Sequence, residues 1–220
     1  MRHVAVLLLA LVLAGCGASG RGHGTATLWV TTGRGQHVLF SGPVAADSDG
    51  IRTLERQLKI TTRYGGRYLQ SVNGIEGSLT DQRDWFYFVN GVEGDRSAAE
   101  VTLRPGDVLW WDYRHWSGAT MSVPVVLGAY PEPFLRGFPG VTSVVGADRV
   151  LAAKIAKQVA GVVNAKKPPR NFVVIGGKLA PDTARIRRFR NGVLLELGTA
   201  AARKLVADPH AFRYRYGDAQ

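Results

Sequence analysis

The chain of 220 residues has a single cysteine, Cys16, and only two methionines. One thiol cannot form an internal disulfide or a thiolate metal site, so core burial alone has to stabilise the fold. The five histidines, at positions 3, 23, 37, 115 and 210, show none of the short spacings to another histidine or to the cysteine that zinc sites need. The longest apolar run, residues 4–14, is shorter than the ~20 residues of a mature transmembrane helix.

The sequence also lacks the usual signatures of catalysis. It contains no Gly-x-Ser-x-Gly motif to present a serine nucleophile, and the segment IGGK, residues 175–178, lacks the spacing of a phosphate-binding loop. Two carboxylate pairs, Asp81 with Asp84 and Glu93 with Asp95, fall in predicted turns, where such side chains are ordinarily just solvated. We therefore expect no enzymatic activity, no metal site and no catalytic cofactor.

The N-terminus has the pattern of an export signal. Arg2 and His3 precede the apolar run, and LAGC at 13–16 resembles the lipobox of bacterial lipoproteins. This resemblance implies a signal peptide over residues 1–15 and a diacylglyceryl anchor on Cys16, followed by a flexible Gly-rich tether to residue 24. The expected location is the extracytoplasmic side of the cell membrane. An ordinary signal peptide with an incidental cysteine is the alternative.

Acidic residues are scarce, and their distribution is uneven. The chain has 28 Lys and Arg against 17 Asp and Glu, a formal net charge of +11. Most of the excess lies beyond residue 120, which together with a change of pattern there predicts two units, residues 25–117 and a basic unit over 122–220. A basic surface outside the cytoplasm suits anionic lipid or wall polymer, or serves solubility alone, whereas an exported protein does not meet nucleic acid.

The first unit has an α+β pattern. Residues 26–32 and 37–44 predict a hairpin, and a short helix follows with Ile51, Leu54 and Leu58 on one stripe and Asp49 as its N-cap. Residues 60–74, broken by Gly65-Gly66, then 84–91 and 103–116 predict further strands. Two strands, a helix and more strands is the order of a β-grasp, a small mixed sheet curled around one helix.

Three segments together carry a family resemblance: RYLQSVNGIEG (67–77), DWFYFVNGVEG (84–94) and LRPGDVLWWDYRHW (103–116). In this order they resemble the C-terminal β-grasp domain of transcobalamin and intrinsic factor, which secreted bacterial proteins share in a family without assigned function. The resemblance covers residues 25–117. The α-helical barrel that closes over the other side of cobalamin in transcobalamin and intrinsic factor has no counterpart in this chain.

The second unit is predicted to be a small α/β domain. Strands are expected at 123–130, 171–177 and 193–197, with an edge strand at 212–216. Helices are expected at 147–163, where the apolar spacing is amphipathic, at 181–192, from Pro181 to Gly192, and at 199–208, capped by Thr199.

The strands at 84–90 and 109–116 are aromatic on both faces. Phe86 and Phe88 alternate with Trp85 and Tyr87, and in the second strand Trp110, Asp112, Arg114 and Trp116 alternate with Trp111, Tyr113 and His115. The short helix can cover only one face, so something else has to cover the other. Three candidates could cover this second face: the second unit of the chain, a flat ligand, or a partner protein such as a transporter subunit.

The resemblance implies cobalamin as the flat ligand, held from one side only. It assigns ring stacking and hydrogen bonding to matching positions of the two strands and their turn, namely Trp85, Tyr87, Asn90, Gly91, Trp110, Tyr113 and Trp116. Trp85 as a plain core residue is the alternative. A second candidate surface is basic: on the predicted helix 181–192, Arg187 and Arg190 would join Lys166, Lys167 and Arg170 to grip an anionic partner, unless these side chains are simply solvated.

The sequence therefore predicts a membrane-anchored binding lipoprotein that captures a flat, cobalamin-like ligand for a membrane importer. The alternative is a structural, adhesion or partner-binding module of the cell envelope without a small-molecule ligand.

Overall fold

The structure is a computed structural model, and it describes residues 24–118 and 121–217. The predicted signal peptide, Cys16 and the tether up to residue 23 lie outside these residues. Among the described residues, none of the helices has both the length and the hydropathy needed to cross a membrane.

The N-terminal half contains a five-stranded mixed sheet in the order β2-β1-β8-β6-β7. Its strands are β1 (Thr25–Thr32), β2 (His37–Ala45), β6 (Arg83–Val89), β7 (Val92–Glu93) and β8 (Val108–His115). The hairpin β1–β2 and the pair β6–β8 are antiparallel, whereas β1 and β8 run parallel at the centre. A separate antiparallel sheet is formed by β3 (Ile60–Arg63), β4 (Tyr68–Val72) and β5 (Ile75–Glu76).

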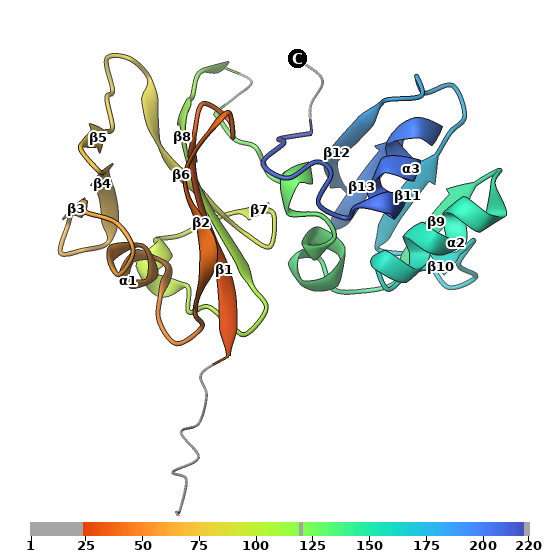
Figure 1. The fold of residues 1–220 in the computed structure, drawn as a ribbon, viewed down its shortest axis with the longest axis horizontal. Coiled ribbons are helices and arrows are strands. Elements are labelled where there is room, and N and C mark those ends of the chain that lie inside the picture. The colour runs from red at the N-terminus through yellow and green to blue at the C-terminus, as the bar shows by residue number, and fades with distance from the viewer. Residues whose placement is uncertain (1–23, 119–120, 218–220) are drawn as a thin grey trace, which may run out of the picture.

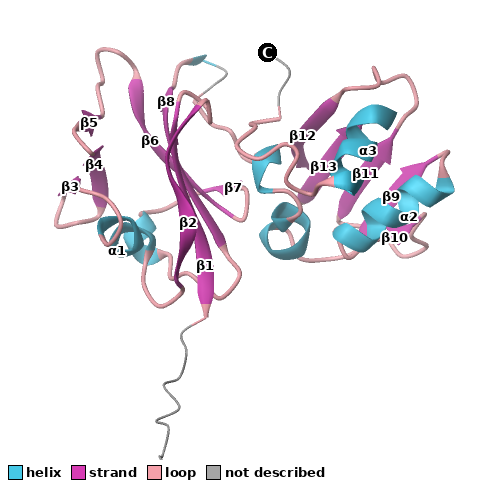
Figure 2. Ribbon diagram, in the orientation of Figure 1, coloured by secondary structure: helices cyan, strands magenta, loops and turns pink. Residues whose placement is uncertain are grey.

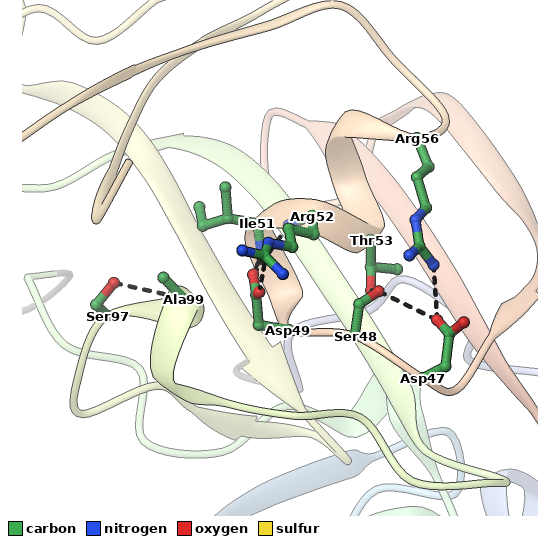
Figure 3. A network of polar contacts seen from close by, with 9 residues as sticks. All are labelled: Asp47, Ser48, Asp49, Ile51, Arg52, Thr53, Arg56, Ser97 and Ala99. Carbon is green, nitrogen blue, oxygen red and sulfur yellow. Dashed lines mark hydrogen bonds and ion pairs between the residues drawn. The ribbon is translucent and has the colours of Figure 1, made fainter. Parts of the chain in front are cut away.

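One short helix, α1 (Gly50–Glu55), follows the first hairpin. The Asp49 carboxylate accepts hydrogen bonds from the backbone N–H groups of Ile51 and Arg52, at 3.0 and 2.9 Å, which confirms the predicted N-cap (Figure 3). Beside it, Ser97 caps a 3₁₀ turn, η1 (Ala98–Glu100), by accepting from the Ala99 N–H (Figure 3). Helix α1 ends before Leu58, so it is shorter than the predicted stripe.

Both faces of the first sheet are buried, and each has a different cover (Figure 1). On one face Trp85, Tyr87 and Trp111 pack in a cluster that includes Ile51 and Leu54 of α1. On the other face Trp29, Phe88 and Trp110 pack against Val123, Val126, Ala129 and Tyr216 of the C-terminal half. The first of the three predicted covers is therefore present.

The C-terminal half contains a second mixed sheet in the order β10-β9-β11-β13-β12. The strands are β9 (Thr142–Gly146), β10 (Val162–Val163), β11 (Asn171–Ile175), β12 (Ala184–Phe189) and β13 (Gly192–Leu197). All run parallel except β12, which pairs antiparallel with β13 at the edge. The helices α2 (Arg149–Gln158) and α3 (Thr199–Ala207) lie next to each other against this sheet and bury Leu151, Ile155 and Leu205 (Figure 2).

The prediction of a helix over residues 181–192 was wrong. This segment is strand β12, in which buried Ala184 and Ile186 alternate with exposed Arg185 and Arg187. The side chains therefore alternate with the period of two residues of a strand, and not with the 3.6 of a helix. Residues 190 and 191 form the turn into β13, and Arg190 has a φ of 55°.

Two predicted strands were also wrong. Residues 123–130 contain an isolated bridge at Val125 and a 3₁₀ turn, η3 (Leu127–Ala129), and the cis peptide bond before Pro131 leads into a short π-helical turn, η4 (Pro133–Gly137). Residues 212–214 lie in a turn, and residues 215–216 have no regular secondary structure. Both segments serve as cover for the first sheet, so their apolar side chains pack without strand pairing. The cap of α3 is Gly198 rather than Thr199, and it makes no side-chain hydrogen bond.

Candidate functional site

A cleft of about 320 Å³ opens beside α1 at the outer edge of β6. Its lining comes from three stretches of chain and three further positions: Arg67, Tyr68 and Leu69 of the β4 region, Trp85, Phe86 and Tyr87 of β6, Glu93, Gly94, Arg96, Ser97 and Ala98, and then Ile51, Trp111 of β8 and Met121. Successive side chains of a strand point to opposite faces. Because three consecutive residues of β6 line the cleft, it runs along the backbone edge of that strand.

Aromatic rings form one wall of this cleft, hereafter the aromatic cleft. The rings of Tyr87 and Trp111 lie 5.1 Å apart, and that of Trp85 lies 5.3 Å from the ring of Tyr113. The Trp85 indole N–H donates to the Ile75 carbonyl at 2.9 Å, and the Tyr87 hydroxyl donates to the Arg96 carbonyl at 2.8 Å. Burial is the main cause that raises the pKa of the Tyr87 hydroxyl to about 12, so it stays a neutral donor at physiological pH.

One buried polar atom of the cleft lacks a partner within the described residues. The indole nitrogen of Trp111 is buried and makes no hydrogen bond there. Leaving such a group unpaired costs about 1–3 kcal/mol. Arg67 and Arg96 at the rim are neutralised by Glu100 and Asp95, so the cleft has no strong net charge of its own.

The predicted ligand-binding residues are divided among several places. Trp85 and Tyr87 lie together in the cleft, and Tyr113 packs directly behind Trp85. Trp110 faces the opposite side of the sheet and is fully buried against the C-terminal half. Trp116 is half-buried and lies outside the cleft.

Asn90 and Gly91 are turn residues with structural contacts. The Asn90 amide donates to Asp107 and accepts from the Val108 N–H, both at 2.9 Å, while its backbone is left-handed at φ 53°. Gly91, at φ 77°, lies so close to Pro133 that an added Cβ would stand 2.7 Å from the proline ring. The Asn90 contacts hold the turn to the start of β8, and the Gly91 carbonyl accepts from the Val126 N–H of the C-terminal half at 2.9 Å, so neither residue is directed at the aromatic cleft.

Sequence reasoning missed Trp111 as a site residue. The alternation of the strand placed Trp110 and Trp111 on opposite faces of the sheet. Which of the two lies at a cleft depends on the β6–β8 register, which pairs Trp111 with Tyr87. It also missed Arg67, Leu69 and Met121, which come from distant segments and carry no local motif. The one available signal was the double aromatic pattern of β6 and β8.

The face of the sheet opposite α1, which carries Trp110, is closed by the C-terminal half. At its centre the buried Asp112 carboxylate accepts from the hydroxyls of Thr31 and Tyr216 at 2.6 and 2.7 Å, and from the N–H groups of Arg34 and Gly35 at 3.1 Å. Desolvation raises the pKa of Asp112, although the four donors oppose that shift. A crevice of about 360 Å³ remains at the margin of this interface, with Trp29, Pro43, Tyr130 and His210 among its lining residues.

Three of the five predicted basic residues lie close together, though on a strand and its turn instead of a helix. Arg187 pairs with Glu196 at 3.6 Å, and its guanidinium and that of Arg190 both lie over the Phe189 ring. Arg170 donates to the carbonyl of Asn191, next to Arg190. Lys166 and Lys167 are exposed and lie in the segment before β11.

Nothing in the described parts of the chain resembles a metal centre, since three or more histidine, cysteine or carboxylate side chains do not gather anywhere in them. The exposed His115 lies near the Ser117 hydroxyl, at 3.4 Å.

Comparison with known proteins places a family match on the N-terminal half. Residues 52–115 match a domain of unknown function (DUF4430). This agrees with the expected resemblance to a family without assigned function, over part of residues 25–117. A search of curated proteins found no match to this sequence.

Two solved structures are similar over 43% of the chain. One is haptocorrin in complex with Cbi, with 13% sequence identity and a TM-score of 0.36, and the match spans only 26% of haptocorrin. The other is a protein of Ruminococcus gnavus ATCC 29149, provisionally named a metal binding protein, with 15% identity, a TM-score of 0.35 and 99% of its chain covered. At these TM-scores neither likeness assigns a ligand to this chain.

Proposed function

We propose that this protein is a lipid-anchored binding protein of the extracytoplasmic membrane surface that captures a flat ligand in the aromatic cleft, without catalysis. The carrying observation is the cleft itself, a concavity whose wall contains Trp85, Tyr87 and Trp111 and whose rim is polar. Ligand sites typically combine an apolar wall with a few polar groups. Cys16 would attach the chain to the membrane, where delivery to an importer would take place.

The order of elements in residues 25–117 supports a β-grasp assignment for this half, and cobalamin is the flat ligand that the resemblance implies. The volume limits how such a ligand would bind. About 320 Å³ lies near the lower end of the range for drug-sized ligands. A corrinoid would insert only one edge, so we expect cobalamin to bind more weakly than a smaller flat ring that enters the cleft entirely.

Titration of the chain from residue 17 onward, with cyanocobalamin and with a library of flat aromatic fragments, tests this proposal. A ligand in the cleft is expected to shift the indole N–H resonances of Trp85 and Trp111 and leave that of Trp116 unchanged. Replacing Met121 at the mouth by Trp should weaken binding at least tenfold, because Met121 is 57% exposed and a larger ring there narrows the opening without entering the core.

Val150→Trp is the matched control, since Val150 is exposed on α2, away from the cleft. If no compound moves either cleft indole at millimolar concentration, the proposal is wrong. A shift that the Met121→Trp variant does not weaken would place binding elsewhere.

A second candidate function is an envelope module that touches anionic polymer or lipid through its C-terminal half. The favouring observation is the gathering of Arg170, Arg187 and Arg190 around the β12–β13 turn, next to the exposed Arg188. Planar guanidinium groups held over aromatic rings keep their donors available for phosphate oxygens.

Charge reversal tests this second function. In a chain that lacks Cys16, Arg187→Glu with Arg190→Glu is expected to abolish sedimentation with phosphatidylglycerol vesicles at low salt. Lys154→Glu with Lys157→Glu makes the same change in net charge on exposed positions of α2 and should retain most of the binding. Equal loss in both variants would mean that net charge, and not this surface, drives the association.

A further inference from the structure

The outer edge of β6 is open over a short stretch. At one end Arg83 exchanges both backbone hydrogen bonds with Ser78, and at the other Val89 pairs with Val92 of β7. The Tyr87 carbonyl accepts from the Gly94 N–H at 2.9 Å, so the backbone groups of Tyr87 point away from β8. Residues two apart on a strand point the same way, and those of Trp85 therefore do so too.

Two backbone groups of this stretch are free within the described residues. The Tyr87 N–H and the Trp85 carbonyl have no backbone or side-chain partner there, whereas the Trp85 N–H is held by the Asp84 carboxylate at 2.8 Å. The β6–β8 register runs without a bulge from Arg83 to Val89, so the edge is regular. Natural sheets usually protect such an edge with a bulge, a proline or a covering segment.

The two free groups form the pattern that a parallel strand requires. In a parallel ladder one residue donates its N–H to the carbonyl before its opposite residue and accepts from the N–H after it. With Phe86 as the opposite residue, these are the Trp85 carbonyl and the Tyr87 N–H. A single residue of an added strand would satisfy both.

The aromatic cleft lies directly on this open edge, because Trp85, Phe86 and Tyr87 line it in succession. Its lining also includes Arg67, Tyr68 and Leu69 from the β4 region and the buried Ala98 and Trp111. A volume of about 320 Å³ suits one or two large side chains and is too small for a folded partner. Backbone pairing with a pocket for a side chain is how strand addition achieves affinity and specificity.

We propose that the ligand of the cleft is an extended peptide that adds to β6 as a parallel strand and places one large apolar side chain against Tyr87 and Trp111. This inference rests on the part of the proposed function that makes the cleft a binding site, and it replaces the flat ligand by an extended peptide whose large side chain enters there. The residue opposite Phe86 makes both new backbone hydrogen bonds. Its two neighbours in the peptide direct their backbone groups away from β6.

Panning a phage-displayed library of random dodecapeptides on the chain from residue 17 onward tests the inference, with the Met121→Trp variant as the counter-selection bait. The expected peptides share a large apolar residue and bind the Met121→Trp variant at least tenfold more weakly than the Val150→Trp control. Binding should slow the hydrogen exchange of the Tyr87 amide, while the Trp85 amide, already bonded to Asp84, should change little.

N-methylation of the selected peptide, one residue at a time, then tests strand pairing. Loss of binding at one position, with tolerance at its two neighbours, is the expected result for a single paired residue. Uniform tolerance, or loss that follows only the apolar side chain, would overturn strand addition, and so would a failure to select any peptide that the Met121→Trp variant rejects.

The two proposals fail in different ways. If flat fragments shift the Trp85 and Trp111 indoles but no peptide binds, the cleft is a small-molecule site and only the peptide inference is wrong. If peptides bind but no flat fragment shifts these indoles, the flat ligand of the proposed function is wrong. If neither fragments nor peptides affect these indoles, the cleft is not a binding site and both proposals are wrong.

Discussion

Replacing Asp112 by alanine is expected to lower the free energy of unfolding by about 3–5 kcal/mol. Asp112 is fully buried at the junction of the two halves, and its carboxylate accepts from Thr31, Arg34, Gly35 and Tyr216. Removing it leaves four buried or half-buried donors without their acceptor, and each such group costs about 1–3 kcal/mol when water does not replace the partner. Urea denaturation followed by Trp fluorescence measures the loss.

Two variants separate this role from a general loss of charge. Asp95 is exposed, and its ion-pair partner among residues 24–118 and 121–217 is its neighbour Arg96, so Asp95→Ala should change the unfolding midpoint little. Tyr216→Phe removes one of the four donors and should cost less than Asp112→Ala, while adding little in the Asp112→Ala background. A loss below 1 kcal/mol for Asp112→Ala would contradict the burial of this group.

Asp112 also makes the stability of the folded state depend on pH, and the burial of its carboxyl group determines the sign of that dependence. Desolvation raises the pKa of Asp112 in the folded state above the unfolded value of about 3.9. The folded state therefore binds the proton more tightly, and the Asp112 contribution to stability falls as the pH rises from the unfolded pKa through the folded one. Comparing denaturation of the wild type and Asp112→Ala across this range isolates that slope.

Most strands were predictable from the sequence because their signals are local. The aromatic and β-branched run of β6, the hairpin β1–β2 and the buried run of β11 each occur where the pattern placed them. The Asp49 cap was equally local. The aromatic character of both faces of β6 and β8 correctly indicated a second cover, which is now seen to include Val126, Ala129 and Tyr216.

The failures involve segments whose structure is decided by distant contacts. The arginines of residues 184–189 are compatible with a helix as well as with a strand. Pairing with β13 is what makes this segment a strand. Residues 212–216 alternate like a strand but pack their tyrosines on Trp29 and Trp110. The cleft was missed for the same reason, since its lining combines β4, β6, β8 and residue 121.

Glu93→Ala is expected to destabilise the protein by about 3–5 kcal/mol, because it removes the carboxylate that pairs with the buried Arg114 guanidinium. The Arg114 side chain has no exposed surface, donates to the Glu93 carboxylate at 2.8 Å and lies 3.7 Å over the Phe86 ring. Glu93 also accepts from the Ser122 hydroxyl and the Val123 N–H, which start the segment leading to the C-terminal half. The loss would therefore reach both the rim of the cleft and the link between the halves.

Adding Arg114→Met to Glu93→Ala should recover much of this stability, because a flexible apolar side chain then replaces the buried charge against Phe86. Glu196→Gln provides the matched control at a solvent-exposed pair: it breaks the 3.6 Å contact with Arg187, which is half exposed, and should cost no more than about 1 kcal/mol. Denaturation midpoints of the wild type, Glu93→Ala, Arg114→Met and the double variant form a double-mutant cycle. If the double variant is less stable than Glu93→Ala alone, Arg114 contributes mainly through contacts other than Glu93, and the buried charge is not the reason for the loss.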